Sequence, residues 1–218
     1  MRRLAFALCS LIALSCREIA PLGTEQPEIT GYGLSGTVTS TGGTPIDSAV
    51  VRLWYTFASS GTPPIDTSHV VVTDPTKIVD VSVLTPKGEF VRQLYLSYRP
   101  AGPVPRFQWD YYDGQGNFVP SGLYLVRIAF DTVVVKTERR IVQGTPTAAT
   151  DRRGVFSIGA SRLPIGDVFD IYSVQNQYIG TYAVLPTIDM EFRKTGLFGA
   201  ASVTLQLNRL TTAAFTVQ

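Results

Sequence analysis

The sequence predicts an all-β protein built from β-sandwiches, and three observations support this expectation. Short stretches dominated by Val, Ile, Thr, Tyr and Phe recur along the chain, each about as long as one strand. Turn-forming residues separate them, since the 218 residues include 19 glycines and 14 prolines. No stretch shows a sustained helical period with capping residues at its ends. Together these features indicate the all-β sandwich class.

The expected strands follow one another at short spacing. We place them at residues 36–40, 48–57, 69–73, 77–84, 91–98, 106–112, 122–130, 132–142, 154–159, 168–174, 179–185 and 201–210. Tyr124, Val126 and Ile128 alternate with their neighbours, so one face of their strand is expected to be core. Lys87-Gly88 predicts a tight hairpin turn after the strand at 77–84.

The N-terminus has the layout of an export signal. Arg2 and Arg3 give a short basic start, and an apolar run of 11 residues follows before Cys16. That run is too short to span a bilayer, which takes about 20 residues. The pattern resembles the bacterial lipobox, which implies cleavage before Cys16 and lipidation of its thiol. Arg17 stands where an acidic residue retains some lipoproteins in the inner membrane, so we expect the outer membrane. Secretion of a soluble protein is the alternative.

The middle of the chain, residues 78–130, has an ordered set of glycines, aromatic residues and a Trp-Asp pair. It closely resembles the immunoglobulin-like domain of the flagellar hook-cap family, the FlgD-like fold. One departure is Tyr111, where glycine commonly follows the Trp-Asp pair. The matching residues are Gly88, Val91, Arg92, Leu94, Trp109, Asp110, Asp113, Gly114, Gly116, Val119, Pro120, Ser121, Gly122 and Tyr124.

The segments on either side share a second pattern when they are joined. Together they resemble a carboxypeptidase regulatory-like (transthyretin-like) sandwich, a kind of domain that is usually non-catalytic. The matching residues are Gly36, Val38, Gly43, Pro45, Ile46, Ala49, Val51, Leu53, Thr150, Asp151, Gly154, Phe156, Ile158, Leu163, Pro164 and Gly166.

These two resemblances predict one sandwich inserted in a loop of another. Domain insertion is tolerated at loops, because domain termini often lie close together. The expected division is a signal peptide at 1–15, a tether at 16–32, the regulatory-like sandwich at 33–58 and 144–218, and the FlgD-like sandwich at 66–143. Two sandwiches in tandem are the alternative.

Charge and cysteine content limit the kinds of partner and cofactor that we expect. Without Arg2 and Arg3 the chain has 17 basic and 17 acidic residues and no basic run longer than two, so we do not expect nucleic acid binding. Both cysteines, Cys9 and Cys16, fall in or next to the signal. The exported body therefore has no thiol for a disulfide or a thiolate metal site, and we expect no cofactor.

Few residues have the pattern of a catalytic, metal-binding or ligand-binding site. His69 is the one histidine and has no nearby cluster of metal ligands or triad partners, so we expect no catalytic role. The loop at 110–117 offers Asp113 and other oxygen donors, but its spacing misses the calcium-loop pattern and favours a turn. Tyr95, Tyr98, Tyr111 and Tyr112 are candidates for contact with a glycan or a protein.

The function that follows is non-enzymatic. We expect a cell-envelope lipoprotein that is held in the membrane by lipid on Cys16 and presents β-sandwich modules for adhesion, scaffolding or assembly. A carbohydrate-binding envelope lipoprotein and an accessory subunit of a secretion or motility machine are the alternatives. Fold resemblance alone transfers little function, so the partner, protein or glycan, stays open.

Overall fold

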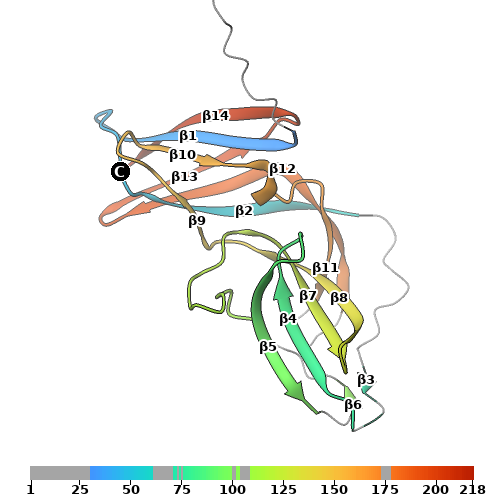
Figure 1. Ribbon diagram of the computed structural model, residues 1–218. Helices are drawn as coiled ribbons and strands as arrows, with labels where there is room; N and C mark the ends of the chain where they lie inside the picture. The colour runs from blue at the N-terminus through green and yellow to red at the C-terminus, as the bar shows by residue number, and fades with distance from the viewer. Residues whose placement is uncertain are drawn as a thin grey trace, which may run out of the picture.

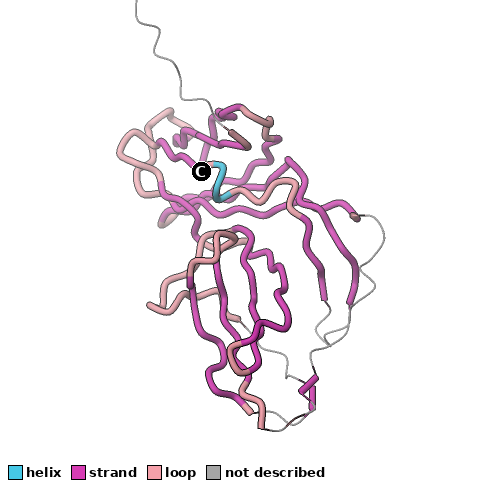
Figure 2. The backbone as a smooth tube through the Cα atoms, turned by 45° about the vertical axis from the view of Figure 1, so that its right-hand side comes forward, coloured by secondary structure: helices cyan, strands magenta, loops and turns pink. Residues whose placement is uncertain are grey.

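The computed structural model describes residues 30–60, 71–72, 74, 76–99, 102–103, 109–172 and 178–218. Within these ranges the protein is all-β, as predicted, and the one described helix is a short 3-10 turn, η1 (Ala160–Arg162). Figure 2 shows strands and loops around this one short helix. No helix in the described ranges is long and apolar enough to cross a membrane. Cys16 and His69 lie outside the described residues.

The first and last parts of the chain form two sheets that face each other (Figure 1). The smaller sheet has the order β10 (Val155–Ile158), β1 (Tyr32–Ser40), β14 (Arg209–Val217). The larger has the order β11 (Val168–Tyr172), β12 (Tyr178–Lys194), β2 (Val50–Ser59), β9 (Pro146–Ala149), and β13 (Leu197–Thr204) also pairs with β12. We call these two sheets the flanking sandwich.

A core of large apolar side chains fills the space between these sheets. Phe156 and Phe215 come from the smaller sheet and Phe192 from the larger, and the Phe192 and Phe215 ring centroids are 4.5 Å apart. Phe156 lies 5.7 Å from Phe192 by the same measure. Aromatic contacts across the sheets are typical of a β-sandwich core, because each strand turns every second side chain inward.

Two segments about 100 residues apart in the sequence meet at one end of this sandwich. The Thr150 hydroxyl donates to the carbonyl of Ile46 (2.6 Å) and accepts from the amide of Ala49 (2.8 Å). The Val38 amide donates to the carbonyl of Gly154 at 2.8 Å. Gly154 has φ +73°, and a Cβ there would lie 2.4 Å from the Val38 oxygen. Only glycine fits at this position, because the backbone there is left-handed and the Val38 carbonyl leaves no room for a Cβ.

The middle of the chain forms a sheet of its own, which we call the central sheet. Its strands, in order, are β5 (Phe90–Tyr98), β4 (Val79–Leu84), β7 (Gly122–Phe130) and β8 (Val133–Val142). Tyr124, Val126 and Ile128 are buried on one face of β7, which confirms the alternation read from the sequence. Gly88 has φ +86° in the β4–β5 turn, as its position after Lys87 predicted.

One face of the central sheet packs against a loop. Trp109 and Val119 belong to its core cluster, together with Val81 and Val126. The other sheet described in this part of the chain is a two-stranded ribbon of β3 (Val71–Val72) and β6 (Gly102–Pro103). Residues 109–112, the described part of the strand expected at 106–112, form a loop with one isolated bridge, between Tyr112 and Phe118. That part of the prediction is wrong.

Two further strand predictions need correction. The strand expected at 179–185 continues to Lys194, and the strand expected at 201–210 is divided by a turn between β13 and β14. The register of β12 on β2 shifts between Val184 and Ile188, a stretch that contains Pro186. A proline has no backbone N–H to donate to the strand ladder, so its position in the sequence indicates the end of a strand. In the structure the strand continues past Pro186 through a bulge.

Candidate functional site

The central sheet docks on the flanking sandwich through the turn that begins β7. Ser121 is 1% exposed there. Its amide donates to the Thr147 hydroxyl at 3.0 Å, and its carbonyl accepts from the Tyr55 hydroxyl at 3.0 Å. Its own hydroxyl contacts the Thr145 carbonyl at 3.3 Å. Every polar group of Ser121 therefore has a partner, which keeps a buried polar contact favourable.

Apolar contact continues across the same joint. Leu123, the second residue of β7, packs in the core of the flanking sandwich, and Ile141 of β8 packs beside that core. At the side, the Arg139 guanidinium donates to the Val168 carbonyl at 2.9 Å and lies 3.8 Å from the Asp167 carboxylate. The two parts are thus joined by a packed interface as well as by the chain itself.

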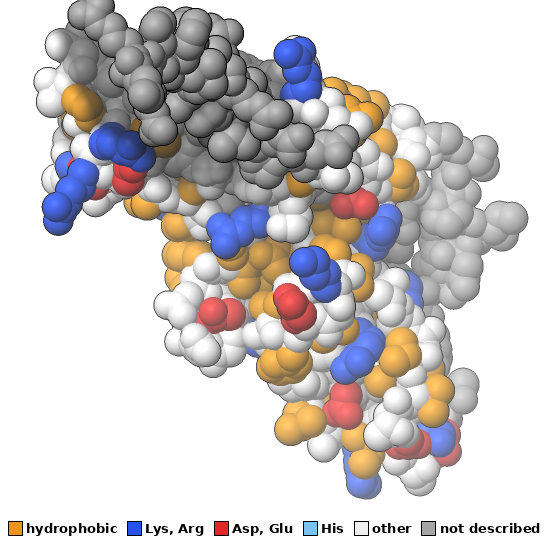
Figure 3. All heavy atoms as spheres, turned by 45° about the horizontal axis from the view of Figure 1, so that its top comes forward, with side chains coloured by type: hydrophobic (Ala, Val, Ile, Leu, Met, Phe, Trp, Pro, Cys, Tyr) orange, Lys and Arg blue, Asp and Glu red, His pale blue; other side chains and the backbone are white. Residues whose placement is uncertain are grey.

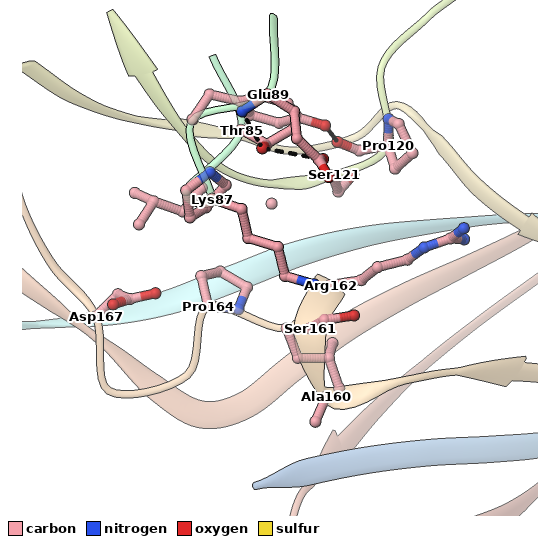
Figure 4. Close-up of a pocket in the computed structure, with 15 residues that line it drawn as sticks. Thr85, Lys87, Glu89, Pro120, Ser121, Ala160, Ser161, Arg162, Pro164 and Asp167 are labelled. Atoms are coloured by element: carbon pink, nitrogen blue, oxygen red, sulfur yellow. Dashed lines mark hydrogen bonds between the residues drawn. The ribbon is translucent and has the colours of Figure 1, made fainter. Parts of the chain in front are cut away.

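A cleft of about 430 Å³ lies beside this joint. Three segments surround it: the β4–β5 turn, the start of β7, and η1 with the loop that follows (Figure 4). Its apolar surface comes from prolines, Leu163 and Tyr124. The residues around it are Thr85, Pro86, Lys87, Glu89, Pro120, Ser121, Gly122, Leu123, Tyr124, Ala160, Ser161, Arg162, Leu163, Pro164 and Asp167. Its volume is in the range of small-molecule sites.

Two cationic residues belong to the lining of the cleft, and Figure 4 shows the Arg162 side chain leading away from Lys87. Lys87 extends from the β4–β5 turn across the opening toward η1, and Arg162 belongs to η1 itself (Figure 4). Neither head group has a hydrogen bond or an ion pair within the described part of the chain. Burial raises the pKa of Tyr124 to about 12, and the Arg162 charge opposes that rise. The guanidinium therefore acts electrostatically on a side chain that lines the cleft.

The cleft also has two acidic residues, and both have partners. The Glu89 carboxylate accepts a hydrogen bond from the Thr85 hydroxyl at 3.2 Å. Asp167 lies close to Arg139, which neutralises it in part.

The four candidate tyrosines form two separate groups. Tyr95 and Tyr98 lie on β5 with ring centroids 5.4 Å apart, and Tyr98 is 38% exposed. Tyr111 and Tyr112 lie in the loop beside the opposite end of β5, where the Gly114 amide bonds the Val91 carbonyl. Seven residues of extended strand separate Val91 from Tyr98, roughly 20 Å. The structure therefore does not bring all four rings to one place.

The loop group has two exposed rings. Tyr111 is 40% exposed and meets Trp109 edge to face, with centroids 5.4 Å apart. Phe118 is exposed and stacks on Tyr112 at 4.1 Å. Tyr111 has φ +64°, a left-handed conformation that costs a non-glycine residue about 1–2 kcal/mol. This is the position at which the FlgD-like pattern has glycine.

The acidic residues of this loop hold its own turns. The Asp113 carboxylate accepts from the amides of Gln115 (2.8 Å) and Asn117 (2.9 Å). These bonds, with that of Asn117 the strongest, lower the pKa of Asp113. Asp110 forms an ion pair with Arg92 at 2.6 Å. Both carboxylates thus have protein partners, and no group of three or more metal-ligating residues occurs in the described ranges.

No family model, no curated protein and no solved structure matches this chain. The cleft was not predicted from the sequence, because its residues come from three segments that are separated by up to about 80 positions. Lys87 and Arg162 carry no local pattern that marks them as neighbours of one cavity. Only the packing of the central sheet on the flanking sandwich brings them together.

Proposed function

We propose that this protein is a non-enzymatic cell-envelope lipoprotein that presents β-sandwich modules for adhesion, scaffolding or assembly. The observation that carries the proposal is a set of exposed apolar side chains at the far end of the central sheet, which we call the distal tip. Leu96 (72% exposed), Tyr98, Val133 (66% exposed), Val134 and Val135 belong to it. Exposed apolar patches on a soluble domain are typical of interaction sites.

Register places the distal tip across the whole sheet. Val79 pairs with Tyr98 on one side and with Phe130 on the other, and Phe130 pairs with Val133. The distal tip therefore extends to both edge strands, β5 and β8. Figure 1 shows this end pointing away from β1, where the chain enters the flanking sandwich, and Figure 3 shows apolar side chains on the surface of the central part. Edge strands with apolar side chains favour pairing with another chain.

Site-specific crosslinking tests the proposal. A photoreactive residue at Leu96 or Val134 is expected to form adducts with a protein partner in intact cells. The same residue at Gln206, which is exposed on the flanking sandwich, serves as the control. Adducts of equal yield at all three positions, or none at the distal tip, would contradict a contact role for this end of the sheet.

Membrane attachment through Cys16 is part of the proposal. The Cys16→Ala chain is expected to leave the membrane fraction and to lose the mass added by acyl chains. Mass spectrometry of the purified N-terminus checks this directly. A chain of unchanged mass that keeps its first residue would exclude the anchor. Stable attachment takes more than one acyl chain, so the mass added at the N-terminus is expected to be at least that of two chains.

We also propose that residues 66–143 are inserted in a sandwich made of 33–58 and 144–218. The support is the pairing of Val50 with Ala149 and of Leu34 with Ile158, which ties the two outer segments together. A chain in which residue 58 is linked directly to residue 144 is expected to fold with a cooperative unfolding transition. A tandem arrangement predicts instead that this shortened chain stays unfolded.

A glycan is the second candidate partner, favoured by the exposed rings of Tyr111 and Phe118. An exposed aromatic face can pack against the C–H face of a sugar ring, which removes apolar surface of both from water. Tyr111→Ala is expected to weaken binding on a glycan array, whereas Tyr182→Phe, which leaves a ring on the flanking sandwich, is not. Equal binding by both variants would remove this candidate.

A further inference from the structure

The start of β1 lies beside the loop that joins β13 to β14. The Gly31 amide donates to the Asn208 side chain at 3.0 Å, and the Asn208 amide donates to the Gly31 carbonyl at 2.7 Å. Gly31 also lies against η1, since a Cβ on Gly31 would be 3.2 Å from the Cβ of Ala160. We call the surface formed by residues 205–210 and η1 the entry surface, because it surrounds the point at which β1 begins.

Two leucines of the entry surface are exposed to solvent. Leu207 is 59% exposed and Leu210 is 38% exposed. The loop that holds them is closed on itself, because the Gln206 amide donates to the Thr211 hydroxyl at 3.2 Å. The two leucines are three positions apart, so their Cα atoms are separated by at most roughly 11 Å. Both are therefore within reach of a single flat partner.

The charge of the entry surface is positive. Arg209 belongs to the loop and Arg162 to η1, and both are exposed. In the described chain, the three strands of the smaller sheet, residues 205–208 and η1 contain no aspartate or glutamate. Residues 17–30, in contrast, have three glutamates and one arginine, a net charge of −2. Attraction to an anionic partner is therefore expected from the entry surface and not from the tether.

The distal tip differs in charge and in position. The Ser97 amide in the distal tip donates to the Asp80 carboxylate at 2.8 Å, and Asp131 precedes Val133 by two residues. Figure 1 shows the smaller sheet and the central sheet on opposite sides of the larger sheet. A partner that covers the entry surface therefore leaves the distal tip free for another contact.

We propose that the entry surface docks on an anionic membrane, the one that holds the lipid on Cys16; this inference rests on the anchor in the proposed function. The two leucines enter the boundary between headgroups and acyl chains, and the two arginines lie at the headgroups. Only 14 residues lie between Cys16 and Gly31, and they reach at most about 50 Å. The anchor thus makes docking an intramolecular step, for which weak contacts suffice.

Quenching by labelled lipid tests the proposal on the full, lipidated chain. Cys9 and Cys16 are the only cysteines, so Leu207→Cys supplies one new thiol for a fluorescent label. Val134→Cys in the distal tip, at 49% exposure, is the matched control. In phosphatidylglycerol vesicles with nitroxide on the acyl chains, the label at 207 is expected to be quenched and the label at 134 is not. Equal quenching at both positions, or stronger quenching at 134, overturns the proposal.

Serine variants and a change of lipid locate the contact. In the chain labelled at 207, Leu210→Ser is expected to lower the ratio of docked to free protein about tenfold, because an inserted leucine loses its transfer out of water. Leu96→Ser, an exposed leucine of the distal tip, leaves that ratio unchanged. Vesicles of phosphatidylcholine alone are expected to give weaker quenching. Equal effects of the two serine variants, or equal quenching in both lipids, count against docking on an anionic surface.

Flotation of the vesicles separates this inference from the anchor. A chain that does not float with the vesicles has no anchor, and both proposals then fail. A chain that floats but shows no quenching at 207 keeps the anchor and overturns docking alone. The substituted side chains are all exposed, so each variant is expected to keep the wild-type unfolding temperature.

Discussion

The Tyr55 hydroxyl donates a hydrogen bond to the carbonyl of Ser121 at 3.0 Å, with both residues buried. Tyr55 lies on β2 of the flanking sandwich, and Ser121 immediately precedes β7 of the central sheet. Burial raises the pKa of Tyr55 far above its ordinary value, so the hydroxyl keeps its proton over the physiological range. One phenol thus connects two sheets that share no strand pairing in the described residues.

Removal of that hydroxyl is expected to loosen the joint. Tyr55→Phe leaves the Ser121 carbonyl buried without its donor, which costs about 1 kcal/mol. For a chain of this size the unfolding temperature is expected to fall by roughly 2–4 °C. Tyr182→Phe is the matched control, since Tyr182 is half-buried and its hydroxyl has no hydrogen bond to any residue that the structure describes. A smaller loss at Tyr55 than at Tyr182 in thermal unfolding would argue against a strong joint.

The turn at Gly154 is expected to tolerate no side chain. Gly154→Ala places a Cβ 2.4 Å from the Val38 carbonyl and keeps a left-handed φ of +73°. The free energy of unfolding is expected to fall by about 2 kcal/mol or more. Gly159→Ala has open space around its Cβ and is expected to change stability little. Denaturant titration of both variants checks the difference, and equal midpoints would falsify this account of the turn.

Backbone strain at Tyr111 can be measured by comparing two variants. Tyr111→Ala and Tyr111→Gly both remove the ring and its contact with Trp109. They differ in how easily the chain adopts φ +64°. The glycine variant is therefore expected to be more stable than the alanine variant by about 1 kcal/mol. If alanine is the more stable of the two, the loop does not hold this residue in the left-handed region.

Acid is expected to weaken the edge of the central sheet through Glu138. Burial alone raises the pKa of Glu138, but Arg140 at 2.7 Å and Lys136 at 3.1 Å bring the pKa below its ordinary value. A carboxylate with a lowered pKa stabilises the fold above the pKa of the unfolded chain, about 4.3, and loses that effect as pH falls through the lower, folded value.

Comparison with Glu138→Gln tests that linkage. The wild-type protein is expected to be more stable than the variant at pH 7, and the gap is expected to close below about pH 4. Asp189→Asn, an exposed position on β12, serves as the control with a gap near zero at both pH values. A gap that persists unchanged at low pH would mean that the ion pairs do not carry the effect. Denaturant midpoints across pH 3–7 give the measurement.

Local patterns predicted the parts of the fold that depend on near neighbours. Alternation along β7 and the glycine turn after Lys87 both follow from residues within a few positions of one another. The extent of β12 did not, because Pro186 reads locally as a stop whereas pairing on both sides carries the strand past it. Long-range pairing overrides local propensity at such points.

The candidate site shows the same division. All four tyrosines are contact candidates from the sequence, and of these Tyr98 and Tyr111 are exposed, although at different ends of β5. Tyr95 and Tyr112 are half-buried, as packing residues of a strand or a stacked pair. The cleft could not be named, since Lys87, Gly122 and Arg162 become neighbours only when two sheets dock.

Strand β14 lies parallel to β1 along its full length, from Tyr32 opposite Arg209 to Ser40 opposite Val217. Phe215 and Val217 of β14 fill the core, so the earliest described strand waits for one that is made almost 180 residues later. During synthesis, the smaller sheet of the flanking sandwich therefore stays incomplete until residues 209–217 are made. Pairing of residues 209–217 with β1 completes this sheet, so removal of that strand would keep the flanking sandwich from closing.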